Sequence, residues 1–178
     1  RVIFIGNPSD RIKEDYLRIL RFLRFSIKYS TSFDKNGLSA CIKLKKKINF
    51  LSVERRILEL RKVILERSFE ENFKKISKTG ILDNTLDTKI YDKNIYHLFL
   101  VERDFKVIDF QRRIKFFLRG TKNLTENIII NKVEKKFANR IKFRIKIDKS
   151  FDDEINRNLF LHGKTMVLDE LIFLYIDG

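Results

Sequence analysis

Apolar positions recur every three or four residues along most of the chain, a spacing typical of helices that bury one face. The first such stretch predicts a helix over residues 10–29, and Asn7-Pro8-Ser9-Asp10 before it supplies a turn and capping side chains. The same spacing predicts helices over residues 36–48, 53–67 (with Ser52 as its cap), 69–78, 93–102, 105–118, 124–145, 152–160 and 165–176. Residues 81–92 show no clear period and are expected to form a connector.

Parts of this pattern also fit strands. Val2-Ile3-Phe4-Ile5 is a strand-like apolar run, and both Ile128-Ile129-Ile130 and the alternation in Phe143-Arg144-Ile145-Lys146-Ile147 suit strands as well as a helix. Against a β fold, six glycines and one proline are too few for the many chain reversals of a sandwich or barrel. The sequence therefore predicts an all-α fold.

The charge of the chain points to a polyanionic partner. Thirty-nine Lys and Arg stand against 24 Asp and Glu, which gives a formal net charge of +15 over 178 residues. Such an excess repels itself in the folded state and is typical of proteins that bind RNA or DNA. A composition biased toward lysine explains part of the excess, but it explains less of the arginines at helical spacings.

Cysteine and histidine usage narrows the chemistry. Cys41 is the only cysteine and follows Ala40 in an amphipathic stretch, so we expect a small core residue in a reducing compartment. His97 and His162 are far apart, without further Cys or His at ligand spacing, which argues against zinc. No apolar run approaches the roughly 20 residues of a membrane span, and no signal-peptide pattern is present. A cytoplasmic protein without a membrane partner is expected.

The densest chemical signal lies in the first predicted helix. On one continuous helix, Arg11, Glu14, Asp15 and Arg18 share a face, and Arg21 follows one turn later. Either carboxylate then reaches the Arg18 guanidinium. A carboxylate beside a guanidinium presents acceptors next to a fork of donors, which suits the hydrogen-bonding edge of a nucleobase. Ordinary ion pairs on a solvated helix face explain the same spacing.

Two longer strings contain these residues. The first is Gly6-Asn7-Pro8-x-x-Arg11-Ile12-x-Glu14-Asp15-x-Leu17-Arg18-x-Leu20-Arg21-x-x-Arg24-Phe25, and the second is Ser52-x-Glu54-Arg55-x-x-x-Glu59-Leu60. Both resemble neck motifs of the class II CCA-adding tRNA nucleotidyltransferases and bacterial poly(A) polymerases, in the same order and at a similar separation. Asn7 stands where that family has aspartate.

The resemblance implies roles for individual residues. Asp15 and Arg18 would form a protein template that pairs with the base of CTP or ATP, with Glu14 orienting Arg18. Arg11 and Arg21 would be supporting nucleotide contacts. The residues of the second motif, Ser52, Glu54 and Arg55, would hold the neck helices together.

The resemblance also implies a domain order. Residues 1–8 would be the end of a catalytic head and its linker, 9–68 the neck, and 69–178 a truncated body that binds tRNA. The head of the family carries paired aspartates that bind Mg²⁺ for phosphoryl transfer. The chain has no Asp-x-Asp pair, so no catalytic residue and no metal ligand is expected in it.

We therefore expect a piece of a longer enzyme, inactive alone and completed by a head in cis or in trans. A poly(A) polymerase of the same family is an alternative, because the base-reading residues look alike in both. A non-catalytic helical RNA-binding relic is another, and the charge and helix pattern alone also fit a basic protein-interaction domain.

Overall fold

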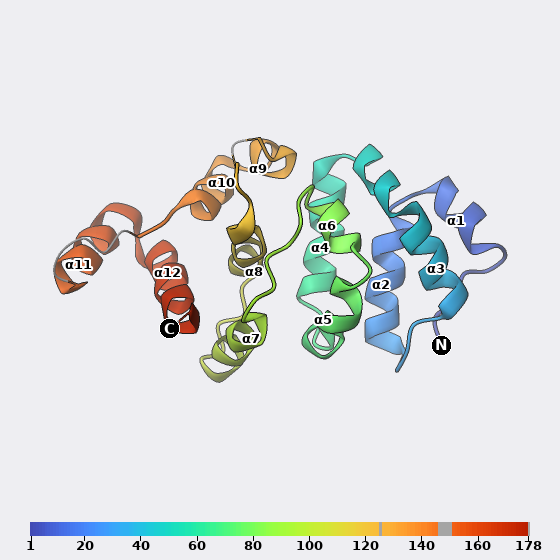
Figure 1. Ribbon diagram of the computed structural model, residues 1–178, viewed down its shortest axis with the longest axis horizontal. Helices are drawn as coiled ribbons and strands as arrows, with labels where there is room; N and C mark the ends of the chain where they lie inside the picture. Colours follow the sequence, from blue (N-terminus) through green and yellow to red (C-terminus); the bar gives the residue numbers. More distant parts are fainter. Residues whose placement is uncertain (125, 146–150, 178) are drawn as a thin grey trace. The chain divides into compact units, whose positions relative to one another are not determined.

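The computed structural model describes residues 1–124, 126–145 and 151–177 (Figure 1). Over these residues the regular structure is helical and contains no strand, so the predicted all-α fold is confirmed. The chain divides into two compact units. The first joins Arg1–Tyr91 to Leu118–Val133, and the second joins Asp92–Phe117 to Glu134–Gly178.

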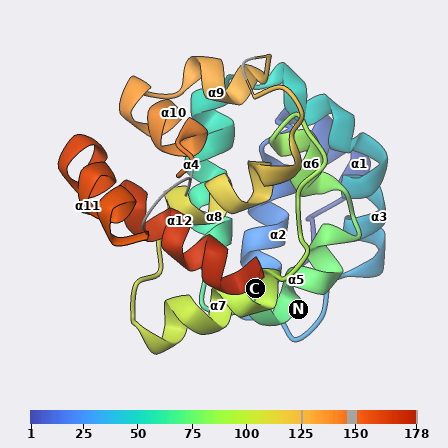
Figure 2. The ribbon, with the colours of Figure 1, turned by 60° about the vertical axis from the view of Figure 1, so that its left-hand side comes forward.

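The first unit is built around two helix pairs. Its helices are α1 (Pro8–Glu14), α2 (Arg18–Tyr29), α3 (Lys35–Leu44), the 3-10 helix η1 (Lys45–Phe50), α4 (Val53–Ile64), α5 (Phe69–Ser77), α6 (Ile81–Thr85), the 3-10 turn η2 (Leu118–Gly120) and α9 (Ile128–Lys132). Helix α1 packs against α3, and α2 packs against α4 (Figures 1 and 2). The core between them holds Ile12, Ile19, Leu20, Leu23, Leu60 and Ile64, all fully buried. Cys41 is also fully buried, and burial raises the pKa of its thiol to about 12, as suits a core residue.

The prediction of one helix over residues 10–29 is wrong at Asp15. The Asn7 side chain accepts hydrogen bonds from the backbone N–H groups of Ser9 and Asp10, which starts α1 at Pro8. At Asp15 the backbone is extended, with φ −156° and ψ 110°, and the Asp15 carboxylate accepts the backbone N–H of Leu17 at 3.1 Å. This local side-chain bond replaces a helical one, so the chain turns and α2 begins at Arg18.

Later boundaries in the first unit follow from caps. The predicted Ser52 cap is confirmed, since its Oγ accepts the N–H of Arg55 at 3.4 Å at the start of α4. The predicted connector over 81–92 contains the short helix α6 in its first part. The predicted helix over 124–145 is split, because Val133 and Glu134 have ψ angles of 164° and 139°.

The second unit contains five helices among its described residues: α7 (Ile95–Asp104), α8 (Phe110–Phe117), α10 (Lys135–Lys142), α11 (Phe151–His162) and α12 (Lys164–Asp177). Helix α10 packs on α8, and α12 packs on α7 and α11. Phe116 is fully buried with its ring centroid 5.5 Å from that of Phe173, and Phe117 and Phe137 are also buried.

Two further predictions need correction. Helix α8 starts five residues later than predicted, because Lys106 has a positive φ of 54° and the Asp109 carboxylate caps the helix by accepting the N–H of Arg112 at 2.7 Å. The strand alternative also fails where it is described: Ile128–Ile130 (in the first unit) are helical, and 143–145 are neither helix nor strand. Lys146 and Ile147 lie outside the described residues.

The interior of the second unit holds charged side chains, which we call the Asp169 network: Glu102, Asp109, Arg112, Arg113, Arg140 and Asp169. Asp169 has no exposed surface and accepts Nε of Arg112 at 2.8 Å, Nε of Arg140 at 2.7 Å and Nη2 of Arg140 at 2.9 Å. Glu102 is equally buried and accepts Nε of Arg113 at 2.6 Å. Buried charges are tolerated only when paired in this way.

A separate buried pair lies beside this network. Nζ of Lys115, with no exposed surface, is 2.8 Å from Oε1 of Glu170, and burial lowers the pKa of the Lys115 ammonium.

Within the described ranges, no helix is both long and apolar enough to cross a bilayer.

Candidate nucleotide-binding site

The Glu14 carboxylate holds Arg18 in place across the turn between α1 and α2. Nη1 of Arg18 donates to Oε2 of Glu14 at 2.6 Å and to the backbone carbonyl of Arg11 at 2.7 Å. Nη1 of Arg11 donates to the other oxygen of Glu14 at 2.7 Å. The hydrogen bond from Arg18, with the nearby charge of Arg11, holds the pKa of Glu14 below its ordinary value. The carboxylate is thus ionised at neutral pH, and this anchoring is lost as the pH falls through the lowered pKa.

Anchoring by one nitrogen leaves the rest of the Arg18 guanidinium available. The described residues offer no hydrogen-bond partner to its Nε or Nη2, and its side chain is 30% exposed. A guanidinium is planar with five N–H donors, so these remaining donors form a fork that matches two adjacent acceptors. The 2-carbonyl and N3 of cytosine are such a pair.

The predicted pairing of Asp15 with Arg18 is not found. Asp15 instead faces the second motif: Nη2 of Arg55 lies 3.0 Å from Oδ2 and 3.2 Å from Oδ1 of Asp15. The break in the helix causes this difference, because it rotates Asp15 away from the face that carries Glu14. A carboxylate offers about four lone-pair sites, so Asp15 keeps acceptor capacity beyond its bonds to Arg55 and Leu17.

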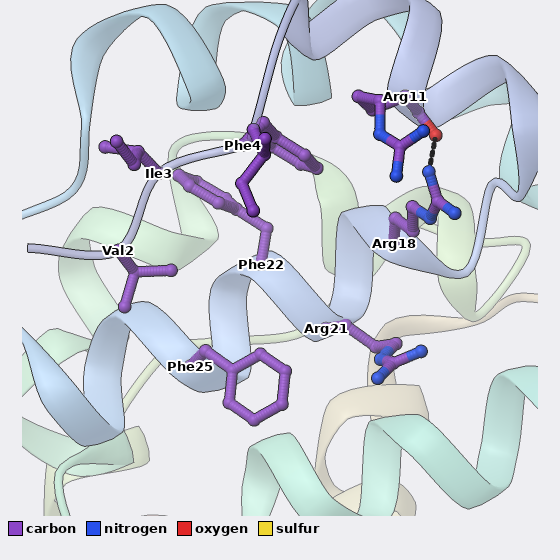
Figure 3. Close-up of a pocket in the computed structure, with 9 residues that line it drawn as sticks. Val2, Ile3, Phe4, Arg11, Arg18, Arg21, Phe22 and Phe25 are labelled. Carbon is purple, nitrogen blue, oxygen red and sulfur yellow. Dashed lines mark hydrogen bonds between the residues drawn. The ribbon is translucent and has the colours of Figure 1, made fainter.

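A cavity of about 420 Å³ opens beside this turn (Figure 3), within the range of small-ligand pockets. Three of the predicted residues, Arg11, Arg18 and Arg21, lie on its wall. Its remaining lining is apolar: Val2, Ile3, Phe4, Ile5, Phe22 and Phe25. Glu14 and Asp15 are not part of the wall but lie in the adjoining helix end and turn. Aromatic faces beside guanidinium groups suit a ligand that combines a planar ring with negatively charged groups.

The apolar wall was not predicted as part of the site. The rings of Phe4 and Phe22 stack with centroids 5.1 Å apart and an interplanar angle of 17° (Figure 3). The guanidinium carbon of Arg21 lies 5.9 Å from the ring centroid of Phe25. The available signals were the apolar run at residues 2–5 and the three-residue spacing of the two phenylalanines on α2.

The second motif supports the turn from α4. Its serine caps the helix, and Arg55 binds Asp15. The Glu54 carboxylate accepts hydrogen bonds from the Glu54 backbone N–H and from the Ser52 hydroxyl. These bonds hold the pKa of Glu54 below its ordinary value. Ser52 and Glu54 therefore order the start of α4, and Arg55 links this helix to the α1–α2 turn.

A further link between the motifs was missed by sequence reasoning. Nε of Arg24 donates to Oε1 of Glu59 at 2.6 Å, and the Glu59 side chain is only 6% exposed. The Arg24 guanidinium also lies 4.3 Å from the ring centroid of Phe25, which lines the cavity. This pair fastens α2 to α4 behind the cavity wall.

The two links are expected to differ in strength. Arg24→Ala leaves the buried Glu59 with only Lys62 at 3.3 Å, so the free energy of unfolding should fall by about 1.5–3 kcal/mol. Arg55→Ala removes a pair whose side chains are 50% and 30% exposed, so the loss should be about 0.2–1 kcal/mol. Urea unfolding followed by circular dichroism measures both. Equal losses, or a larger loss for Arg55→Ala, would contradict this ranking.

Comparison with known proteins gives several matches of one kind. A CCA-adding enzyme of Staphylococcus saprophyticus is 23% identical over 175 residues, which cover 96% of this chain and 42% of that enzyme. A CCA-adding enzyme of Bacillus velezensis is 30% identical over 91 residues, 51% of this chain and 23% of that protein. The human mitochondrial CCA tRNA nucleotidyltransferase 1 is 39% identical over 71 residues, 36% of this chain and 16% of the human protein.

No family model and no solved structure matches the chain. The chain spans less than half the length of the curated relatives it matches. Both sequence strings and the site built from them lie in a chain that is similar, over nearly its whole length, to a CCA-adding enzyme.

Proposed function

We propose that this chain is the neck and body portion of a tRNA nucleotidyltransferase that adds C and A nucleotides to tRNA 3′ ends. The observation that carries the proposal is the Arg18 fork, held by Glu14 at the wall of an aromatic cavity. The names of the similar proteins supply the reaction class.

The base of CTP or ATP is read by Arg18 and Asp15 in this proposal. Cytosine and adenine share an exocyclic amine next to a ring nitrogen acceptor. The amine donates to Asp15, and the ring nitrogen, with the carbonyl in cytosine, accepts from the free donors of Arg18. Guanine and uracil present a carbonyl where the amine stands, and that carbonyl oxygen faces the Asp15 carboxylate unfavourably. Arg11 and Arg21 support the nucleotide with positive charge.

RNA binding is assigned to the cationic surface of the chain. A formal charge of +15 favours the tRNA backbone and predicts an affinity that falls steeply with salt. Part of that charge is internal, because the buried arginines of the Asp169 network are matched by carboxylates.

The metal chemistry is assigned to a head domain, in cis or on another polypeptide, that binds Mg²⁺ and acts in the cytoplasm. The described residues bring together no group of three His, Cys, Asp or Glu side chains fit for a metal ion. In this proposal the chain selects nucleotides and holds RNA, and the head catalyses addition.

Complementation with a head tests this function. The catalytic head of a CCA-adding enzyme, fused ahead of Gly6 or supplied separately, should restore Mg²⁺-dependent addition of C and A to tRNA that lacks its 3′ end. Neither the head nor this chain alone should do so. Addition of A alone to many RNAs would indicate a poly(A) polymerase. Tight RNA binding without any restored addition would indicate the non-catalytic relic.

A further inference from the structure

An exposed aromatic ring stands beside the α1–α2 turn and belongs to no feature assigned so far. Phe50, at the end of η1, is 72% exposed. The ammonium of Lys47 lies 4.7 Å from its ring centroid. The ring of Tyr16 meets it at 6.2 Å with an interplanar angle of 70°. Tyr16 follows Asp15 in sequence, so this ring pair adjoins the turn that carries the base-reading carboxylate.

The local fold presents the ring outward. Ile48 of η1 is fully buried, and Nζ of Lys45 donates to the carbonyl of Thr79 at 2.7 Å. These two residues anchor the 3-10 helix, and Lys46, Lys47 and Phe50 are left on its exposed side. Tyr16 and Phe50 meet edge to face, so neither ring is stacked face to face on the other.

A single exposed apolar residue needs no explanation in itself. Here the ring is accompanied by cations, and the described residues offer Lys46 and Lys47 no carboxylate within ion-pairing distance. Open aromatic faces next to unpaired cations are the pattern by which proteins bind single-stranded nucleic acid: bases stack on the rings and phosphates meet the lysines. A base inside a duplex is stacked on both faces, whereas an unpaired end leaves base faces free.

We propose that Phe50, with Tyr16 and Lys47, is a stacking platform for an unpaired base at the 3′ end of the RNA. The proposal rests on the function given above, which requires that end to lie near the bound nucleotide. Stacking is tolerant of base identity, so the platform holds the end whether C or A was added last.

The chain lacks tryptophan, which makes a direct test possible. Phe50→Trp introduces a single tryptophan whose fluorescence is quenched when a base stacks on it. A short single-stranded RNA should quench it in a saturable manner, and the same sequence placed in the interior of a longer duplex should not. Tyr29→Trp is the matched control, because Tyr29 is 63% exposed with Lys28 5.5 Å from its ring but lies at the far end of α2. Its fluorescence should change little.

Affinity separates stacking from general hydrophobic contact. Phe50→Ala should weaken binding of the single-stranded RNA about fivefold to hundredfold, the range for loss of one stacked base. Phe50→Leu should weaken it nearly as much, because leucine is apolar but has no π face, while Phe50→Tyr should retain it. Thermal unfolding should be unchanged in all three, since the side chain is exposed.

Phe50→Leu could retain RNA affinity while Phe50→Ala loses it. That result would show that position 50 makes a general hydrophobic contact without stacking, and it would overturn the platform. Equal quenching at positions 50 and 29 would also overturn it. If a supplied head restores C and A addition while Phe50→Ala binds RNA like the wild type, the platform is wrong and the proposed function stands. If the wild-type chain does not bind single-stranded RNA and no head restores addition, the proposed function fails as well.

Discussion

Asp169→Ala should lower the free energy of unfolding of the second unit by about 3–5 kcal/mol, the range for breaking a buried ion pair. The carboxylate accepts three hydrogen bonds from Arg112 and Arg140, which are 3% and 6% exposed. Without it, two guanidinium groups remain buried. Arg140 keeps Asp109 at 3.0 Å, and Arg112 keeps the carbonyl of Val107 at 2.6 Å, so the charges are only partly compensated.

Urea unfolding followed by circular dichroism measures this loss, with Asp104→Ala as the matched control. The Asp104 side chain is 66% exposed, and its nearest cation, on Arg103, is 3.6 Å away, so its removal should change stability by less than about 0.5 kcal/mol. Adding Arg140→Met to Asp169→Ala should recover part of the loss, because it removes one stranded cation. A loss below about 1 kcal/mol for Asp169→Ala would show that water reaches this network.

Arg18→Ala should have the largest effect on nucleotide choice. In the enzyme completed by a head, we expect kcat/KM for CTP and ATP to fall about tenfold to hundredfold, because hydrogen bonds from a charged donor are worth roughly 1.5–3 kcal/mol. Discrimination against GTP and UTP should fall with it, while binding of tRNA stays within about twofold. Single-turnover addition with each nucleotide measures the ratio.

Three variants sharpen this experiment. Arg18→Lys keeps the charge but loses the planar fork, so selectivity should still be impaired. Glu14→Gln weakens the anchor and should give an intermediate loss. Lys13 lies on α1, as Glu14 does, and its ion-pair partner Asp10 is exposed. Lys13→Ala should therefore behave like the wild type. Unchanged selectivity in Arg18→Ala would remove Arg18 from base recognition.

Helices with a buried face were predictable from sequence, but some of their ends were not. The apolar spacing of Ile12, Ile19 and Leu20 continues in phase through residues 15–17, so periodicity alone gave no sign of the break at Asp15. The cause is a side chain that binds a backbone N–H two residues on. The late start of α8 has a similar local origin in the Asp109 cap.

Pairs close in sequence were more predictable than distant ones. The Glu14–Arg18 contact follows from a spacing of four residues, whereas Asp15–Arg55 joins positions 40 apart. The partner of Arg112 on α8 is another such case, because Asp169 lies 57 residues later in the sequence. Local pattern carries no information on such pairs, because the packing of whole helices determines them.

The break at Asp15 also has a mechanical consequence. Arg11 and Glu14 belong to α1, whereas Arg18 and Arg21 belong to α2, so the cavity wall is divided between two helices joined by residues 15–17. The Glu14–Arg18 hydrogen bond ties the two helices together across this joint. One unbroken helix would give the cavity a single fixed width. In the proposed function, this joint lets the same set of donors meet a one-ring and a two-ring base.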